Sequence, residues 1–236
     1  MNPWYFAGAI APLGAGLYAW GALYPGSQVF GPTLRHSSGN SSLGLTFDDG
    51  PNMAITPHLL TLLDRYQVKA TFFLIGKHVR ACPDLAREVA ARGHSIGNHT
   101  ETHPSLLWMS RRRIIQQLSQ CQDAIEQATG QRPTIMRPPF GERGPQLQSA
   151  VRQAGLHGVA MWSLTAFDWK PQPAERLIRR LRGAGNGDVI VLHDGDHLAM
   201  GADRLHLLKA LEFWLPRWRD DGLKFVTLDA SNLTRA

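Results

Sequence analysis

Two adjacent carboxylates, Asp48 and Asp49, stand in the segment Thr-Phe-Asp-Asp-Gly-Pro at residues 46–51. They follow the short apolar run 43–47 and precede a Gly-Pro pair. An apolar run that ends in such residues is typical of a strand end, where functional side chains tend to lie. Successive strand residues point to opposite faces, but a bend would let both carboxylates reach one pocket. One could then hold a metal ion while the other takes a proton. The alternative is an Asp-Gly turn with a solvated second carboxylate.

Two histidines, His99 and His103, are spaced four residues apart in the segment 98–104. On one turn of helix this spacing places both imidazoles on the same face. Zinc accepts imidazole nitrogen and carboxylate oxygen, and a catalytic zinc site keeps one position for water. Two histidines and one aspartate would therefore form a plausible set of three ligands. His94 would face elsewhere, and we interpret it as a structural histidine.

A second pair, His193 and His197, has the same spacing. Gly195 lies between them and makes a continuous helical turn less favourable. Asp194 and Asp196 could serve a hard cation, but the loop lacks the ligand spacing of an EF-hand. We favour His193 as an acid–base group over a metal site in this stretch.

Short apolar runs alternate with amphipathic segments along the rest of the chain. This pattern predicts strands over 43–47, 70–75, 134–137, 159–164, 189–193 and 225–228, and helices over 56–66, 83–91, 110–129, 147–154, 173–181 and 205–217. Near-continuous apolar strands alternating with helices indicate an α/β fold with a parallel sheet, open or barrelled. The polar residues that follow the strands should then converge at the carboxyl ends. These are Asp48-Asp49, residues 137–140, residues 165–169 and His193-Asp194.

The composition fits one globular domain that needs no disulfides, with 236 residues of which 43% are hydrophobic. Cys82 and Cys121 are far apart without CxxC spacing, so we expect two free buried thiols. The net charge of +6 favours anionic surfaces or substrates. We find no basic stripe with interleaved aromatics and no nucleic-acid-binding motif. Nucleic acid is therefore not an expected partner.

The first 34 residues contain no charged side chain. Residues 3–24 are long enough to cross a bilayer as one helix, with aromatic residues near both ends. A cleaved secretory signal ending at Gly21, or a buried hairpin, are the alternatives. We therefore divide the chain into an apolar segment with the start of a linker, 1–34, and a catalytic domain, 35–236. The expected location is the bacterial inner membrane or outside the cell. The basic flank from Arg35 leans toward a cytoplasmic catalytic domain, and the side of the membrane stays open.

Two arginine-rich stretches have two interpretations. They are Arg111 to Arg113 and the group Arg176, Arg179, Arg180 and Arg182. Most such runs are solvated faces, but beside a membrane anchor they could face anionic head groups.

Taken together, these residues resemble the polysaccharide deacetylase family, the NodB-homology domain of carbohydrate esterase family 4. The resemblance runs from about Leu43 to Leu228, with five motifs in the family's order. The motifs are residues 46–51, 98–104, 137–141, 168–169 and 192–193. Thr165 and Phe140 replace an Asp and a Tyr that are frequent in the family.

The resemblance implies a distorted (β/α) barrel and one divalent metal, usually zinc, with Co²⁺, Ni²⁺ or Mn²⁺ as other candidates. It implies that Asp49, His99 and His103 hold the metal. Asp48 would be the general base, and His193 would protonate the leaving amine. The resemblance also implies roles for the residues around these groups. Arg137 would pair with Asp48, and Asp168 would orient Arg137 or His193. The backbone of Phe140 would stabilise the oxyanion, and the residues in contact with the substrate would be Pro139, Trp169 and Leu192.

The implied function is hydrolysis of an N-acetyl group from an amino sugar, in a glycan or a lipid-linked saccharide. A deformylase, or an amidase acting on a substrate that is not a glycan, is the alternative within hydrolases. An inactive glycan-binding module and a membrane-tethered scaffold are the alternatives from other classes. The ionisable residues 48, 49, 99, 103 and 193 argue against a binding module, which needs no such set.

Overall fold

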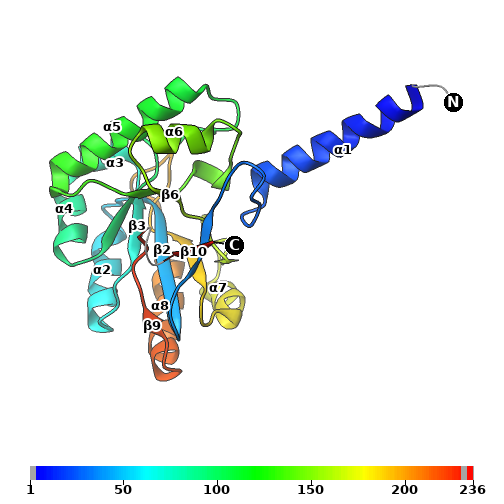
Figure 1. Ribbon diagram of the computed structural model, residues 1–236. Coiled ribbons are helices and arrows are strands. Elements are labelled where there is room, and N and C mark those ends of the chain that lie inside the picture. The colour runs from blue at the N-terminus through cyan, green and yellow to red at the C-terminus, as the bar shows by residue number, and fades with distance from the viewer. Residues whose placement is uncertain (1–3, 230–232, 236) are drawn as a thin grey trace.

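The structure, a computed structural model, describes the backbone of residues 4–229 and 233–235 and the side chains of residues 14–229. A curled sheet of parallel strands forms the centre, with helices around its outside (Figure 1). The strand order is β6-β5-β4-β3-β2-β8-β7, and β9 also pairs with β2. The strands are β2 (Ser42–Gly50), β3 (Thr71–Leu74), β4 (Ser95–Asn98), β5 (Ile135–Met136), β6 (Gly158–Val159), β7 (Leu164–Thr165), β8 (Val189–His193) and β9 (Lys224–Phe225).

The sheet is a half-barrel, because within the described residues β6 and β7 form its two edges and do not pair with each other. Instead β1 (Leu34–Ser37) lies across this gap, with bridges from Leu34 to Ala160 and from His36 to Asp188. Its other partner is the antiparallel strand β10 (Leu233–Arg235). The expectation of a distorted barrel is therefore met in a coarser form.

Helices connect most of the successive strands of the sheet. They are α1 (Trp4–Leu23), α2 (Thr56–Arg65), α3 (Gly76–Ala81), α4 (Pro83–Ala91), α5 (Arg111–Thr129), α6 (Leu147–Gln153), α7 (Ala174–Arg180) and α8 (Leu205–Asp220), with 3₁₀ turns at Pro139–Gly141 and Leu181–Gly183. The long helix α5 ends where Gly130 adopts a left-handed conformation, as a C-terminal glycine allows.

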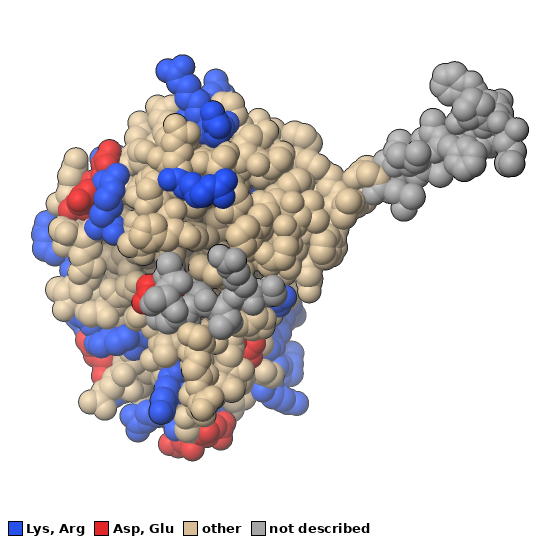
Figure 2. Space-filling model, in the orientation of Figure 1, with Lys and Arg blue, Asp and Glu red and all other residues tan. Residues whose placement is uncertain are grey.

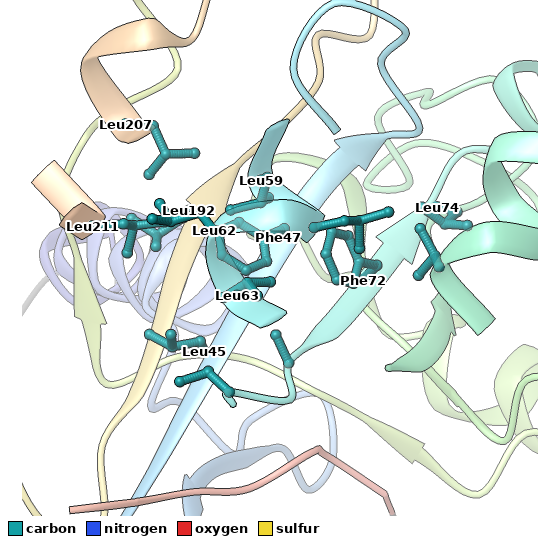
Figure 3. Close-up of a cluster of buried hydrophobic side chains, with 14 of the residues drawn as sticks. Leu45, Phe47, Leu59, Leu62, Leu63, Phe72, Leu74, Leu192, Leu207 and Leu211 are labelled. Carbon is teal, nitrogen blue, oxygen red and sulfur yellow. The ribbon is translucent and has the colours of Figure 1, made fainter. Parts of the chain in front are cut away.

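The main core lies between the sheet and the helices. Along β2, Leu43, Leu45 and Phe47 point outward to this core and are fully buried. Figure 3 shows Leu45 and Phe47 with Leu192 of β8 and Leu211 of α8 in this core. Because strand side chains alternate, the residues between them face the interior of the half-barrel. The alternation of side chains along β2 and β8 thus decides which of them can reach a site in the interior of the half-barrel.

Most predicted elements are present, with a few exceptions. The predicted strand 159–164 is wrong, since β6 and β7 are separate short strands. Neither β1 nor β4 was predicted from the sequence. Cys82 and Cys121 are free, as expected, although Cys82 is only half-buried.

The N-terminal segment forms the helix α1 rather than a hairpin. Within the described part of the chain, no helix has the length and apolar character needed to cross a membrane. The first half of the expected anchor, at residues 3–13, lies outside the residues whose side chains are described.

We predict that Leu211→Ala lowers the free energy of unfolding by about 2–5 kcal/mol, because it opens a cavity in the fully buried core. Leu205→Ala in the same helix is the matched control, since Leu205 is exposed. Its effect should stay within about 0.5 kcal/mol. Urea denaturation followed by circular dichroism measures both. Equal losses would contradict the assignment of this helix face to the core.

Candidate metal and catalytic site

A bend within β2 brings the two adjacent carboxylates to one cavity. Asp48 faces the interior by the alternation of the strand, and Asp49 would face the helices. Asp49 instead has a φ of 69°, and the register with β3 shifts between Asp48 and Gly50. A positive φ is uncommon outside glycine but is best tolerated by Asp and Asn. Both carboxylates consequently line a cavity of about 540 Å³.

The loop after β4 presents His99 and His103. The predicted helical turn is wrong: the segment is irregular, and Thr100 and His103 have φ values of 67° and 58°. Side chains lock this shape, since the Asn98 side chain accepts a hydrogen bond from the backbone of Thr100 at 2.8 Å. Thr100 Oγ1 in turn accepts one from the backbone of His103 at 3.1 Å. The two imidazoles meet through this loop and not through helical periodicity.

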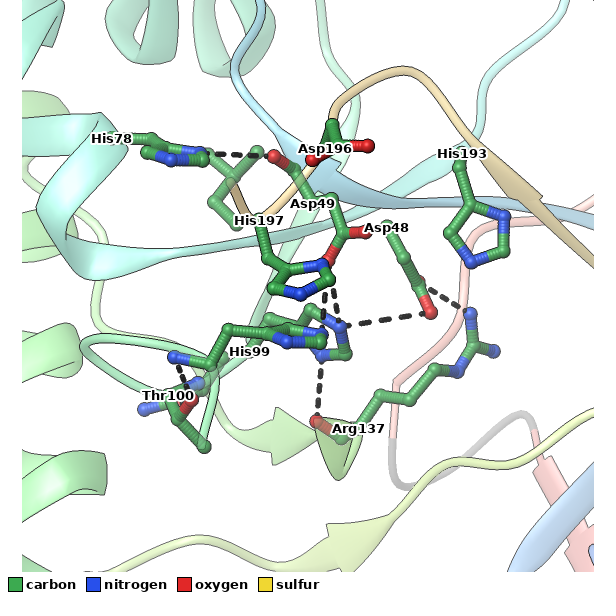
Figure 4. A network of polar contacts seen from close by, with 12 residues as sticks. Asp48, Asp49, His78, His99, Thr100, Arg137, His193, Asp196 and His197 are labelled. Atoms are coloured by element: carbon green, nitrogen blue, oxygen red, sulfur yellow. Dashed lines mark hydrogen bonds and ion pairs between the residues drawn. The ribbon is translucent and has the colours of Figure 1, made fainter. Parts of the chain in front are cut away.

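Both imidazoles converge on a single oxygen of Asp49 (Figure 4). Asp49 Oδ1 lies 3.1 Å from His103 Nε2 and 3.4 Å from His99 Nε2. All three side chains are buried, and their ligand atoms lie within 4.8 Å of one another. Burial opposes ionisation of Asp49, but the two imidazoles hold its pKa well below the usual range. Burial also lowers the pKa of His103, which favours its neutral form.

This arrangement fits a divalent metal ion. In a neutral His99, Nδ1 donates to the carbonyl oxygen of Arg137 at 2.8 Å, so Nε2 carries a lone pair. That lone pair points toward an anionic carboxylate oxygen, and two acceptors facing each other need a cation or a proton between them. Oxygen and imidazole nitrogen together suit zinc and related ions.

Arg137 holds Asp48 from inside the half-barrel. Its guanidinium is fully buried and donates to Asp48 Oδ1 at 2.8 Å and to Thr46 Oγ1 at 2.6 Å. The carbonyl oxygen of Met161 accepts a third bond at 3.0 Å. Burial lowers the pKa of Arg137, and the negative charge of Asp48 opposes that shift. Asp48 keeps its second oxygen, Oδ2, toward the cavity, 3.9 Å from His99 Nε2.

His193, at the end of β8, is bound by Asp168. Asp168 Oδ1 lies 2.9 Å from His193 Nδ1, and Oδ2 accepts the backbone N–H of His193 at 2.8 Å. Burial disfavours the charged imidazole, but Asp168, with smaller contributions from Asp49 and Asp48, raises the pKa of His193 to about 9. Asp168 thus contacts His193 and not Arg137, which resolves the two alternatives.

The cavity contains most of the residues that the sequence singles out. Asp48, Asp49, His99, His103, Phe140, Trp169 and His193 line it. Arg137 and Asp168 are buried behind this lining. Pro139 and Leu192 are also buried and do not belong to the lining, because Leu192 points into the helix-facing core. Val191, its neighbour along β8, lines the cavity instead.

Three further residues lie beside the candidate ligands in positions that the sequence did not predict. His78 Nδ1 lies 3.0 Å from the carbonyl oxygen of Asp49 and supports the bend. His197 stacks on His103 at 4.5 Å between ring centroids and does not meet His193. Asp196 accepts a hydrogen bond from Arg204 at 3.0 Å, and Asp194 instead accepts one from the hydroxyl of Thr56. The segment His-Asp-Gly-Asp-His indicated His197 and Asp196 as candidates, whereas His78 had no recognisable signal in the sequence.

We predict that the purified protein binds about one divalent ion per chain and that His99→Ala and His103→Ala each remove it, because three ligands are needed to hold a catalytic zinc. His197→Ala should retain the ion, since this imidazole stacks beside the ligands without converging on Asp49. Metal analysis after dialysis measures all three variants. Loss of metal in His197→Ala with retention in His99→Ala would overturn the ligand assignment.

Comparison with known proteins agrees with this geometry. Residues 35–159 match the family model described as polysaccharide deacetylase. The peptidoglycan-N-acetylglucosamine deacetylase PgdA of Listeria monocytogenes is 34% identical over 87% of this chain. The chain spans only 42% of that relative's length. A chitooligosaccharide deacetylase of Azorhizobium caulinodans is 35% identical over 85% of this chain and 99% of its own.

A solved structure has the same fold. The Bc1960 peptidoglycan N-acetylglucosamine deacetylase, solved in complex with 4-naphthalen-1-yl-N-oxidanyl-benzamide, superposes with a TM-score of 0.76. It is 31% identical and covers 82% of this chain and 89% of its own. Since the family model covers more than half of the residues and these relatives extend over most of the rest, the chain belongs to the polysaccharide deacetylase family.

Proposed function

We propose that this protein hydrolyses the N-acetyl group of an amino sugar within a glycan. The observation that carries the proposal is the placement of two different acid–base groups around one candidate metal site. Asp48 and His193 line the same cavity as Asp49, His99 and His103. The relatives named as peptidoglycan and chitooligosaccharide deacetylases support N-acetylglucosamine as the sugar.

We further propose zinc as the ion held by Asp49, His99 and His103. When bound, such an ion would polarise the acyl carbonyl and acidify a water molecule. Asp48 then accepts the proton of the attacking water through Oδ2, the oxygen that Arg137 leaves toward the cavity. Arg137 fixes the other oxygen and so sets the direction from which this base acts.

His193 supplies the proton for the leaving amine. A pKa of about 9 keeps its imidazole protonated at neutral pH. Asp168 occupies Nδ1, so Nε2 is the nitrogen left to donate. The amide nitrogen must be protonated before it can leave as an amine, which makes this group necessary for acyl C–N cleavage.

The cavity mouth offers surfaces for the sugar. Phe140 and Trp169 are both exposed and line the cavity, and aromatic faces of this kind can stack on a pyranose ring. We assign the backbone N–H of Phe140 to the developing oxyanion.

We predict that kcat/KM falls as the pH rises through about 9, because His193 then loses the proton it must donate. A metal ion bound to Asp49 would cancel part of the contribution of this carboxylate to the raised pKa of His193. The alkaline limb of the pH profile should therefore lie at or below about pH 9. Asp168→Asn should lower the limb by about 1 to 3 pH units, since it removes the charge that stabilises the imidazolium. Asp84→Asn, at an exposed carboxylate, is the control and should leave the profile unchanged. An unshifted limb in Asp168→Asn would exclude His193 as the acid.

We predict that Asp48→Asn keeps the metal but lowers turnover by about 10²–10⁴-fold, because the amide cannot accept the water's proton. Acetate release should be measured with N-acetyl chitooligosaccharides, peptidoglycan fragments and polyprenyl-linked amino sugars. Formate release from the N-formyl analogues tests the deformylase alternative. Saccharide binding without release of either acid by the metal-loaded wild type would instead support a glycan-binding module.

A further inference from the structure

The helix α1 leaves the domain with apolar side chains exposed around it. Figure 1 shows it pointing away from the sheet, and no charged residue precedes Leu34. Residues 14–17 and 19–20 are exposed, and burial begins only at Gly21 and Ala22. A helix that is apolar all round belongs inside a protein core or a membrane. The domain itself does not cover these residues, so their surroundings must come from elsewhere.

The junction between α1 and the domain is built from buried contacts. Arg143 is almost fully buried and donates to the backbone carbonyls of Tyr24 and Ser27, the latter at 2.7 Å. Its own backbone N–H donates to Ala22 at 3.0 Å. Burial lowers the pKa of Arg143 only to about 10, so it remains a cation at neutral pH. These bonds hold the end of α1 and fix the direction in which the helix leaves the domain.

Exposed apolar and aromatic side chains surround this junction, and we call them the collar. Trp108 is 83% exposed, although its ring stacks on Tyr18 at 6.2 Å between centroids. Trp20 stacks on Tyr24 at 5.7 Å. On the face shown in Figure 2, the surface where α1 joins the domain carries no acidic side chain. The collar consists of Leu17, Trp20, Leu23, Tyr24, Val29 and Trp108.

Cationic side chains adjoin the collar. Arg111, Arg112 and Arg113 follow Trp108 closely in the chain and are all exposed. Arg111 and Arg112 also line a hollow of about 450 Å³ at the start of α5, where a helix N-terminus adds to the attraction for anions. Surfaces with exposed Trp and Tyr next to arginine favour a position at the boundary between lipid head groups and acyl chains.

We propose that the collar docks on the surface of an anionic phospholipid bilayer, with α1 inserted and Arg111 to Arg113 against the head groups. The bonds of Arg143 to the end of α1 then orient the catalytic domain relative to the bilayer. A phospholipid surface accounts for both the apolar side chains and the adjoining cations, whereas a second copy of this chain, with a net charge of +6, would repel the first.

The test uses the full chain and vesicles of brominated phosphatidylcholine with and without phosphatidylglycerol. Bromine quenches a tryptophan only at the bilayer, so the difference between wild type and Trp108→Phe reports the depth of Trp108. We expect strong quenching of Trp108 emission. Trp214→Phe, in α8 and away from the collar, should reveal no quenched component. Vesicle binding with Trp108 unquenched would overturn the docking, and so would a failure to bind vesicles.

A matched pair of triple variants tests the cations. R111Q/R112Q/R113Q should weaken the phosphatidylglycerol-dependent part of binding by on the order of 100-fold, whereas R176Q/R179Q/R182Q removes the same charge near α7 and should not. Equal effects would reduce the proposal to nonspecific charge attraction and overturn it. Two measurements without lipid test whether a second copy of this chain covers the collar instead. Sedimentation gives the oligomeric state, and soluble quenchers report the exposure of Trp108. A dimer in which Trp108 is protected from the quenchers would assign the collar to a second copy and overturn the proposal.

Discussion

The left-handed backbone at Asp49 is the constraint on which the site depends. It sits inside β2, where an ordinary φ would send the second carboxylate into the helix-facing core. Its neighbours are shaped to permit it. A side chain at Gly195 would come within 2.0 Å of the carbonyl oxygen of Asp49, and one at Gly50 would press on the carboxylate of Asp194. His78 binds that same carbonyl oxygen, so the bend is held from both sides.

A second constraint is the buried cation of Arg137, which connects strands that are distant in sequence. Its partners lie in β2 and in the segment between β6 and β7, and Phe73 of β3 packs against its guanidinium at 4.2 Å. Thr46 accepts from Arg137 and donates to the carbonyl oxygen of Ile190, which extends the network to β8. Leaving a buried charge without its partner is strongly unfavourable. The position of Asp48 is therefore set by the electrostatics of the whole half-barrel.

The sequence allowed the parallel sheet, the carboxylate pair and the two ligand histidines to be predicted, because apolar runs and ionisable residues are visible locally. The sequence did not allow us to predict how these side chains are brought together. The spacing of His99 and His103 suggested a helical turn. The structure has a loop instead, in which the side chains of Asn98 and Thr100 accept hydrogen bonds from the backbone. β4 escaped notice because it is short and contains Gly97, which makes room for the ring of Phe73. Likewise, Leu192 was expected at the cavity wall, but the register of β8 turns Val191 inward.

The same pair of residue types, aspartate with histidine, produces two opposite chemistries within one cavity. At the candidate metal site one oxygen of Asp49 faces two buried imidazoles, and burial lowers the pKa of His103. Neutral imidazoles are what a metal ion requires. At the other wall both oxygens of Asp168 bind a single histidine, and the pKa of His193 rises to about 9. A protonated imidazole is what a departing amine requires. Burial outweighs the carboxylate at His103, whereas Asp168, with smaller contributions from Asp49 and Asp48, outweighs burial at His193. Strand register and loop shape decide which of these surroundings each histidine has.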